Sequence, residues 1–277
     1  MKIKHLLHNN QFVSLLKSLD VLSRSVNEKS IHLFRVNTKK IRAIVELVKE
    51  IDSGKNSRVM MQAPLRRLFK SSGELREIQV NRRLLNAYGC SKNRDPEYFG
   101  YLKKCEKHLL TRIKKDLSAI NAATLKKRKN KMDRLWRPLK IKKVKRLTQE
   151  YVEARVHNAR KLAKQSWSTK TVHRIRKELK AALPVLKIYD RQAQEPEDLK
   201  ALIGIIVRLN LALGKWHDKV ALVRSLRSFE KREKQDPGGI VKQGVRQRIV
   251  QDCNENLKQI RTLLPVLFER SAFFFRS

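Results

Sequence analysis

The chain has 277 residues, enough for one large domain or two of ordinary size, and 41% of them are apolar, which excludes wholesale disorder. It carries 65 Lys and Arg residues against 26 Asp and Glu residues, and the net charge of +39 far exceeds the charge of about 2 to 8 that keeps a small domain soluble. Because such an excess costs stability through self-repulsion, the composition predicts a polyanionic partner: a phosphate polymer, nucleic acid or an anionic membrane surface.

The sequence predicts an all-α fold. Nine Gly and seven Pro are few for this length, and apolar residues recur at three- and four-residue steps along almost the whole chain, as in amphipathic helices. Asp95 before Pro96 is typical of a helix start, with an N-capping side chain and a proline at the first helical position. Helix breakers divide the chain into eight predicted helices: residues 9–25, 29–51, 57–88, 96–122, 143–163, 169–190, 197–230 and 240–270.

A run of like charges separates the fourth predicted helix from the fifth. It reads Lys126-Lys127-Arg128-Lys129-Asn130-Lys131, and such a cluster is typical of a solvated linker. We therefore expect a first half at residues 1–125, a basic linker at 126–140 and a second half at 141–277.

A shift of the chain by 141 residues brings the two halves into register. The shift places His32 on His173 and, without a gap, Gly73 on Gly214. Four pairs of basic residues match as well: Arg35 with Arg176, Lys39 with Lys180, Arg67 with Arg208, and Arg83 with Arg224. The repeat indicates an internal duplication, and short links between successive helices favour antiparallel packing, so each half is predicted to be a four-helix bundle.

Each half begins its match with a stripe of cations led by a histidine. His32, Arg35, Lys39 and Arg42 are spaced so that they share one face of a helix, and His173, Arg176 and Lys180 repeat the pattern. Like charges at this spacing repel one another by a few tenths of a kcal/mol per pair, and a bound anion would reverse the sign. The stripes therefore predict an anion-binding surface.

A second repeated segment contains a glycine followed by a cation and a carboxylate. It reads Gly73-Glu74-Leu75-Arg76-Glu77 in the first half and Gly214-Lys215-Trp216-His217-Asp218 in the second. A glycine within a helix costs about 1 kcal/mol relative to alanine, so it indicates a close approach of helices or a local break. The carboxylates either orient neighbouring cations or cap a helix, and the sequence leaves both open.

These two motifs together resemble the CHAD domain, the conserved histidine α-helical domain, over residues 20 to 270. The resemblance implies two four-helix bundles related by a pseudo-twofold axis, with a basic groove or channel between them. It also implies binding of inorganic polyphosphate without catalysis. Carried over to this sequence with the repeat, the implied polyphosphate-binding residues are His32, Arg35, Lys39, Lys40, Arg42, Arg67, Arg76, Arg83, His173, Arg176, Lys180, Arg208, His217 and Arg224.

The second half departs from the family pattern. Ala181 and Leu183 stand where Lys40 and Arg42 stand in the first half, and His217 stands where the motif has an arginine. We therefore expect the second stripe to hold an anion less tightly than the first.

Two other functions stay open. The charge also suits a nucleic-acid-binding protein, although aromatic residues make up only 6% and none is interleaved with the stripes as a base-stacking surface requires. An enzyme acting on polyphosphate is the other alternative, but the sequence has no Gly-x4-Gly-Lys-[Ser/Thr] phosphate loop. We expect neither a cofactor nor a metal site.

The remaining features bear on location. Three cysteines, Cys90, Cys105 and Cys253, match no metal-binding spacing and are expected to be reduced thiols of a cytoplasmic protein. No signal-peptide run or membrane-spanning stretch is expected. The protein is expected in the cytoplasm, where polyphosphate granules are a candidate site of association; the oligomeric state and the preferred polymer length stay open.

Overall fold

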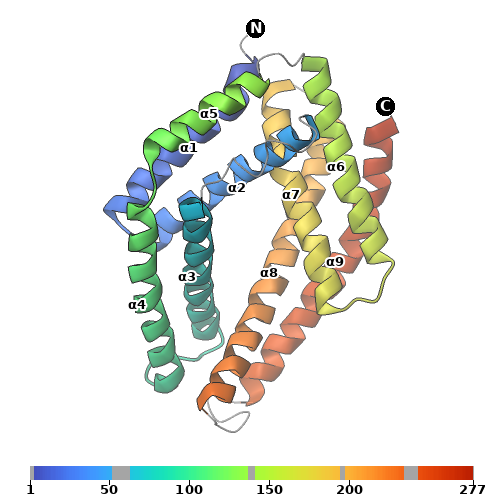
Figure 1. The fold of residues 1–277 in the computed structure, drawn as a ribbon. Coiled ribbons are helices and arrows are strands. Elements are labelled where there is room, and N and C mark those ends of the chain that lie inside the picture. The colour runs from blue at the N-terminus through green and yellow to red at the C-terminus, as the bar shows by residue number, and fades with distance from the viewer. Residues whose placement is uncertain (1–2, 52–62, 137–140, 194–196, 234–242, 277) are drawn as a thin grey trace.

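All regular structure in the described part of the chain is helical. The structure, a computed structural model, describes residues 3–51, 63–136, 141–193, 197–233 and 243–276. In this part nine helices follow one another (Figure 1): α1 (Ile3–Arg24), α2 (Glu28–Ile51), α3 (Ala63–Ala87), α4 (Pro96–Ser118), α5 (Ala122–Trp136), α6 (Ile141–Ala163), α7 (Thr169–Ala193), α8 (Glu197–Glu233) and α9 (Gln243–Arg276). The prediction of an all-α fold is confirmed.

The helices pack mainly as neighbouring pairs. Figure 1 shows α1 beside α5 and α3 beside α4 on one side of the molecule, with α6, α7, α8 and α9 on the other. Helix α2 packs on α1 and α3, and it also reaches across to α6 and α7. This crossing brings the first predicted stripe, on α2, against the second, on α7.

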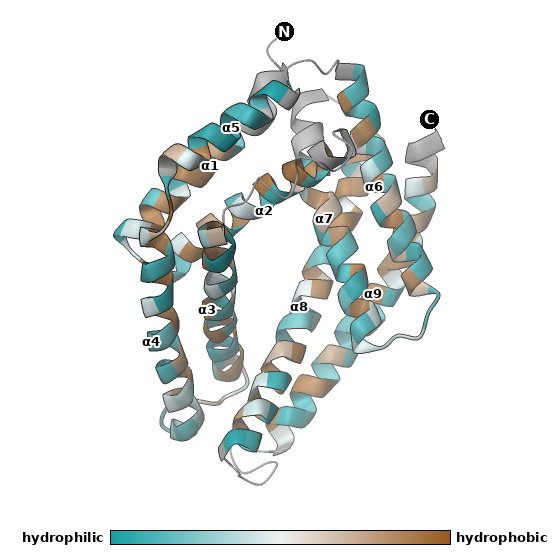
Figure 2. Ribbon diagram, viewed as in Figure 1, coloured by the Kyte–Doolittle hydropathy of each residue, from teal (hydrophilic) through white to brown (hydrophobic). Residues whose placement is uncertain are grey.

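The amphipathic pattern explains which faces are buried. On α2, Ile31, Phe34 and Ile41 are almost fully buried, and Val172 and Ile175 occupy the same role on α7. Figure 2 shows apolar and polar residues on different sides of these helices. Because the apolar residues recur every three or four positions, the intervening cations share the opposite face.

The run predicted to be a solvated linker is instead helical, so the prediction of eight helices is wrong. Residues 126–131 lie within α5, which packs on α1 through the buried Leu125. Ala, Leu, Lys and Arg are strong helix formers, and Lys126, Lys127 and Lys131 are exposed, so the charges do not prevent the helix. The division into two duplicated halves stays a prediction, as does the exact place of the boundary.

The start of α4 differs in one detail from the prediction. Pro96 occupies the first turn as expected, but Asp95 makes no side-chain capping bond to the helix. Its carboxylate accepts a hydrogen bond from the backbone N–H of Ser91, at 3.1 Å, and so closes the preceding turn instead. Gly89 has a positive φ of 82° in this connection, a conformation that glycine adopts without a steric penalty.

Two polar joints hold α1–α5 against α6–α9. At the first, the Tyr151 hydroxyl donates to Glu46 at 2.7 Å, and Arg155 pairs with Glu46 at 3.5 Å and with Glu178 at 3.2 Å. At the second, the hydroxyl of Tyr98 bonds Ser225 at 2.7 Å, and other contacts of the same region join Tyr88 to Asp252 and Tyr98 to Phe229. The first joint fixes α2 beside α6 and α7, close to the two stripes.

Candidate anion-binding site

The cationic faces of α2 and α7 meet at two lysines. The side chains of Lys39 and Lys180 lie close enough to affect each other's protonation, although they are 141 residues apart in the sequence. Arg35, Arg76 and Arg176 are close enough to act on this pair electrostatically. We call Arg35, Lys39, Arg76, Arg176 and Lys180 the central cationic cluster.

Burial and crowding make it costly to charge the two lysines. Burial, together with the charges of the neighbouring arginines, lowers the pKa of Lys39 to about 8. Burial likewise lowers the pKa of Lys180 to about 7, with Lys39, Arg176 and Arg35 adding to the effect. The pair therefore holds fewer protons at neutral pH than two ordinary lysines, and a bound anion would reverse this.

Arg35 is fixed against α3. Its Nη1 donates to the backbone carbonyl of Phe69 at 2.7 Å and to the Ser72 hydroxyl at 3.4 Å, and the guanidinium lies 4.6 Å from the centre of the Phe69 ring. Burial, with the charges of Arg76 and Arg42, lowers the pKa of Arg35 to about 10, so the side chain stays charged at neutral pH.

Gly73 leaves room for the Arg35 guanidinium, whereas its counterpart Gly214 accommodates no such side chain. A Cβ at Gly73 would lie 2.7 Å from Nη1 of Arg35, so the glycine does mark a close approach. A Cβ at Gly214 would have no neighbour within 4 Å. The expectation of close approach is confirmed for the first half and wrong for the second.

The predicted histidines adjoin the cluster from two directions. His32 is close to Arg35, Lys39 and Arg76. His173 stacks on His217, with ring centres 5.5 Å apart, and is close to Arg176 and Arg224. Burial, then nearby positive charge, lowers the pKa of both His32 and His173. At neutral pH each therefore offers a phosphate oxygen one neutral N–H donor.

Two carboxylates touch the edges of the cluster. Glu28, which the sequence reasoning missed, accepts a hydrogen bond from Arg76 and lies 3.3 Å from Nη2 of Arg83. Asp218 acts electrostatically on Arg176 and Lys180, and its Oδ1 lies 3.5 Å from Nδ1 of His217. Because Asp218 lies in the middle of α8 it cannot cap that helix, and its neighbours favour the other role left open, a carboxylate that acts on nearby cations. The signal for Glu28 was an acid in the first turn of α2, one turn before His32.

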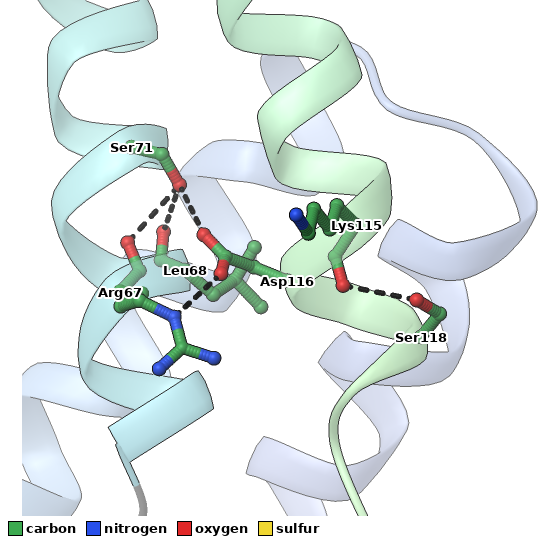
Figure 3. Close-up of polar contacts among 6 residues, drawn as sticks. All are labelled: Arg67, Leu68, Ser71, Lys115, Asp116 and Ser118. Carbon is green, nitrogen blue, oxygen red and sulfur yellow. Dashed lines mark hydrogen bonds and ion pairs between the residues drawn. The ribbon is translucent and has the colours of Figure 1, made fainter.

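The other predicted residues are not members of the cluster, although Arg42 is close enough to act on Arg35 electrostatically. Arg67 turns to α4, where its Nε lies 3.0 Å from Oδ1 of Asp116, and Ser71 bonds the same carboxylate (Figure 3). Arg42 is exposed and lies over the Phe69 ring, 5.1 Å from its centre. Arg208 is exposed on α8, and no contact within the described helices ties it to the cluster; Lys40 is half-buried on α2. Ligand binding by any of these residues, and the groove between the halves, stay predictions.

Within the same described residues, no three His, Cys, Asp or Glu side chains are placed to hold a metal ion. No described helix is long and apolar enough to cross a membrane. The three cysteines are free thiols, with Cys90 and Cys253 buried.

The likeness to known proteins agrees with the motifs. The family model of the CHAD domain matches residues 8–227. The crystal structure of the CHAD domain from the plant Ricinus communis superposes with a TM-score of 0.67 over 95% of this chain and 90% of that one; at 15% identity it shows the shared fold alone. No curated protein sequence matches. Since the family match spans well over half of the sequence, the chain belongs to the CHAD domain family.

Proposed function

We propose that this CHAD domain binds inorganic polyphosphate at the central cationic cluster, without changing it chemically. One observation carries the proposal: α2 and α7 bring Lys39 and Lys180 together, with Arg35 and Arg176 close enough to act on both electrostatically. Such a concentration of buried positive charge is unfavourable in the free protein. A polyanion laid across it would remove the repulsion and supply the missing acceptors.

Polyphosphate fits the chemistry of these side chains. The polymer has repeated phosphate oxygens and no base edges, so recognition depends on charge, spacing and hydrogen-bond donors. Arginine offers a planar fork to two oxygens and lysine offers a point charge. His32 and His173 flank the cluster and add N–H donors, and the CHAD family is linked in general to polyphosphate binding.

A pair of double variants tests the site. Arg35→Glu with Lys39→Glu reverses two charges in the cluster, whereas Lys126→Glu with Lys127→Glu reverses two exposed charges on α5. We expect the first to weaken binding of polyphosphate of defined length more than tenfold, about 1.4 kcal/mol, and the second to have a much smaller effect. Isothermal titration calorimetry measures both, and circular dichroism checks the fold. Because Arg35 is packed on α3, Lys39→Gln serves as a milder variant.

Equal losses of affinity in the two double variants would mean that the polymer responds to the total charge of the protein. The cluster would then not be a dedicated binding site. Competition then separates the ligands: duplex DNA or RNA at the same phosphate concentration should not displace polyphosphate. Displacement would favour the nucleic-acid alternative. Shortening of the polymer during incubation with the protein and a divalent metal would contradict the non-catalytic role.

The same affinity would bring the protein to polyphosphate granules in the cytoplasm. A fluorescent fusion should collect on granules and become diffuse when Arg35 and Lys39 are both replaced by Glu. A fusion that stays diffuse in granule-containing cells would contradict this location.

A further inference from the structure

The free protein already holds an anion at one edge of the cluster, and that anion is its own Glu28. The Glu28 carboxylate accepts a hydrogen bond from Nη1 of Arg76, and the same oxygen lies 3.3 Å from Nη2 of Arg83. His32 is near enough to interact with it as well. Carboxylate and phosphate oxygens use the same arginine donors, so a phosphate can reach Arg76 fully only when Glu28 moves away.

We propose that Glu28 is an internal competitor that must leave Arg76 when a phosphate chain binds, and that it thereby limits the affinity of the site. The inference rests on the proposed function. Arg76 belongs to the cluster, since its charge acts on Arg35, Lys39 and His32. Displacing Glu28 would free the charge and the N–H donors of Arg76 for the ligand.

Exposure decides which partner of the ion pair can move. The Glu28 side chain is 45% exposed, whereas that of Arg76 is 25% exposed. Glu28 can therefore rotate into water and stay solvated, while the less exposed Arg76 on α3 stays in place. Glu28 also lies in the first turn of α2, where the helix dipole favours a negative charge, so the carboxylate needs no new partner after it is displaced.

Two other arginine–carboxylate pairs on α3 show the contrast. Asp116, the partner of Arg67, is only 7% exposed and cannot leave without burying a bare charge or distorting α4. Glu106 pairs with Arg82 at 2.6 Å with exposures of 25% and 35%, but this pair faces α4 rather than the cluster. The Glu106–Arg82 pair therefore matches Glu28–Arg76 in chemistry and differs from it in position.

The test compares Glu28→Gln with Glu106→Gln. Each variant removes one negative charge and weakens one arginine pair, so the general effect of net charge is the same in both. We expect Glu28→Gln to bind polyphosphate about three- to fivefold more tightly than Glu106→Gln, as for the loss of a partly exposed ion pair. Calorimetry at fixed ionic strength measures the affinities, and thermal unfolding confirms that both variants are folded.

A double-mutant cycle locates the effect. If Glu28 competes for Arg76, then Glu28→Gln should gain little affinity in a protein that already carries Arg76→Gln. Equal affinities of Glu28→Gln and Glu106→Gln, or weaker binding by Glu28→Gln, would overturn the proposal, the second result meaning that Glu28 orients Arg76 for the ligand. If the wild-type protein does not bind polyphosphate, the proposed function is wrong as well. If the wild type binds and the two variants have equal affinities, only the role of Glu28 as a competitor is wrong.

Discussion

At the scale of single residues, the Lys39–Lys180 pair makes stability depend on pH. The folded-state pKa values of about 8 for Lys39 and about 7 for Lys180 lie below the ordinary 10.5 of lysine. Between pH 7 and 10 the unfolded chain therefore binds more protons than the folded one, so the free energy of unfolding rises with pH. Well below pH 7 both amines are protonated in both states, and the penalty is complete.

We predict that Lys180→Met flattens this rise and stabilises the ligand-free protein at pH 7 by about 1 kcal/mol, because it removes a buried positive charge that is crowded by Lys39, Arg176 and Arg35. Urea denaturation of wild type and variant at pH 7 and pH 9 measures both effects. Lys126→Met, on the exposed face of α5, is the control and should leave the slope unchanged. The same slope in wild type and Lys180→Met would show that the two lysines are not crowded.

The two repeated glycines should respond differently to alanine. Alanine is favoured over glycine within a helix by about 1 kcal/mol, and a Cβ at Gly214 would meet nothing within 4 Å. Gly214→Ala should therefore stabilise the protein by about that amount. Gly73→Ala should gain less or lose stability, since its Cβ displaces the Arg35 guanidinium from the Phe69 carbonyl. Chemical denaturation of the two variants tests this. Equal gains in the free energy of unfolding would show that the Arg35 guanidinium is not held in place beside Gly73.

At the scale of helix pairs, Arg67 joins α3 to α4 instead of serving the cluster. Its ion pair with the buried Asp116 (Figure 3) satisfies a carboxylate that has little access to water. Arg67→Gln should lower the free energy of unfolding by about 1 kcal/mol and leave polyphosphate affinity within about twofold, since a single exposed charge contributes little. Denaturation and calorimetry on one preparation give both values. A large loss of affinity with unchanged stability would return Arg67 to the binding site.

Helix α5 shows where pattern reading fails at this scale. The cationic run at 126–131 predicts a linker, because like charges repel in an isolated segment. In the folded chain Leu125 is buried in the contact with α1, and Lys129 pairs with Asp133 at 3.1 Å, one turn further on. The buried Leu125 and this ion pair support the helix, and the helix propensity of the run is already high.

At the scale of the whole molecule, a ligand across α2 and α7 would bridge the two sides of the fold. Because only the folded protein gathers the cluster, polyphosphate should bind it more tightly than the unfolded chain and raise Tm as the polymer concentration increases. The gain should shrink steeply as NaCl is raised, since binding releases condensed counterions. Differential scanning fluorimetry with and without polyphosphate, repeated with Arg35→Glu plus Lys39→Glu, tests this. A gain that persists at high salt, or in the double variant, would contradict an electrostatic site.

The amino-acid sequence alone determined the helical class, the two histidine-led stripes, their offset of 141 residues and the CHAD resemblance. These features are encoded locally, because helix faces repeat every three or four residues and motifs are short. Only the tertiary structure decided that Lys39 lies close to Lys180 and that Arg67 forms an ion pair with Asp116. It also decided that Glu28 forms an ion pair with Arg76. Long cationic side chains reach several neighbours, and their partner depends on which carboxylate the packing of distant helices brings within a few ångströms.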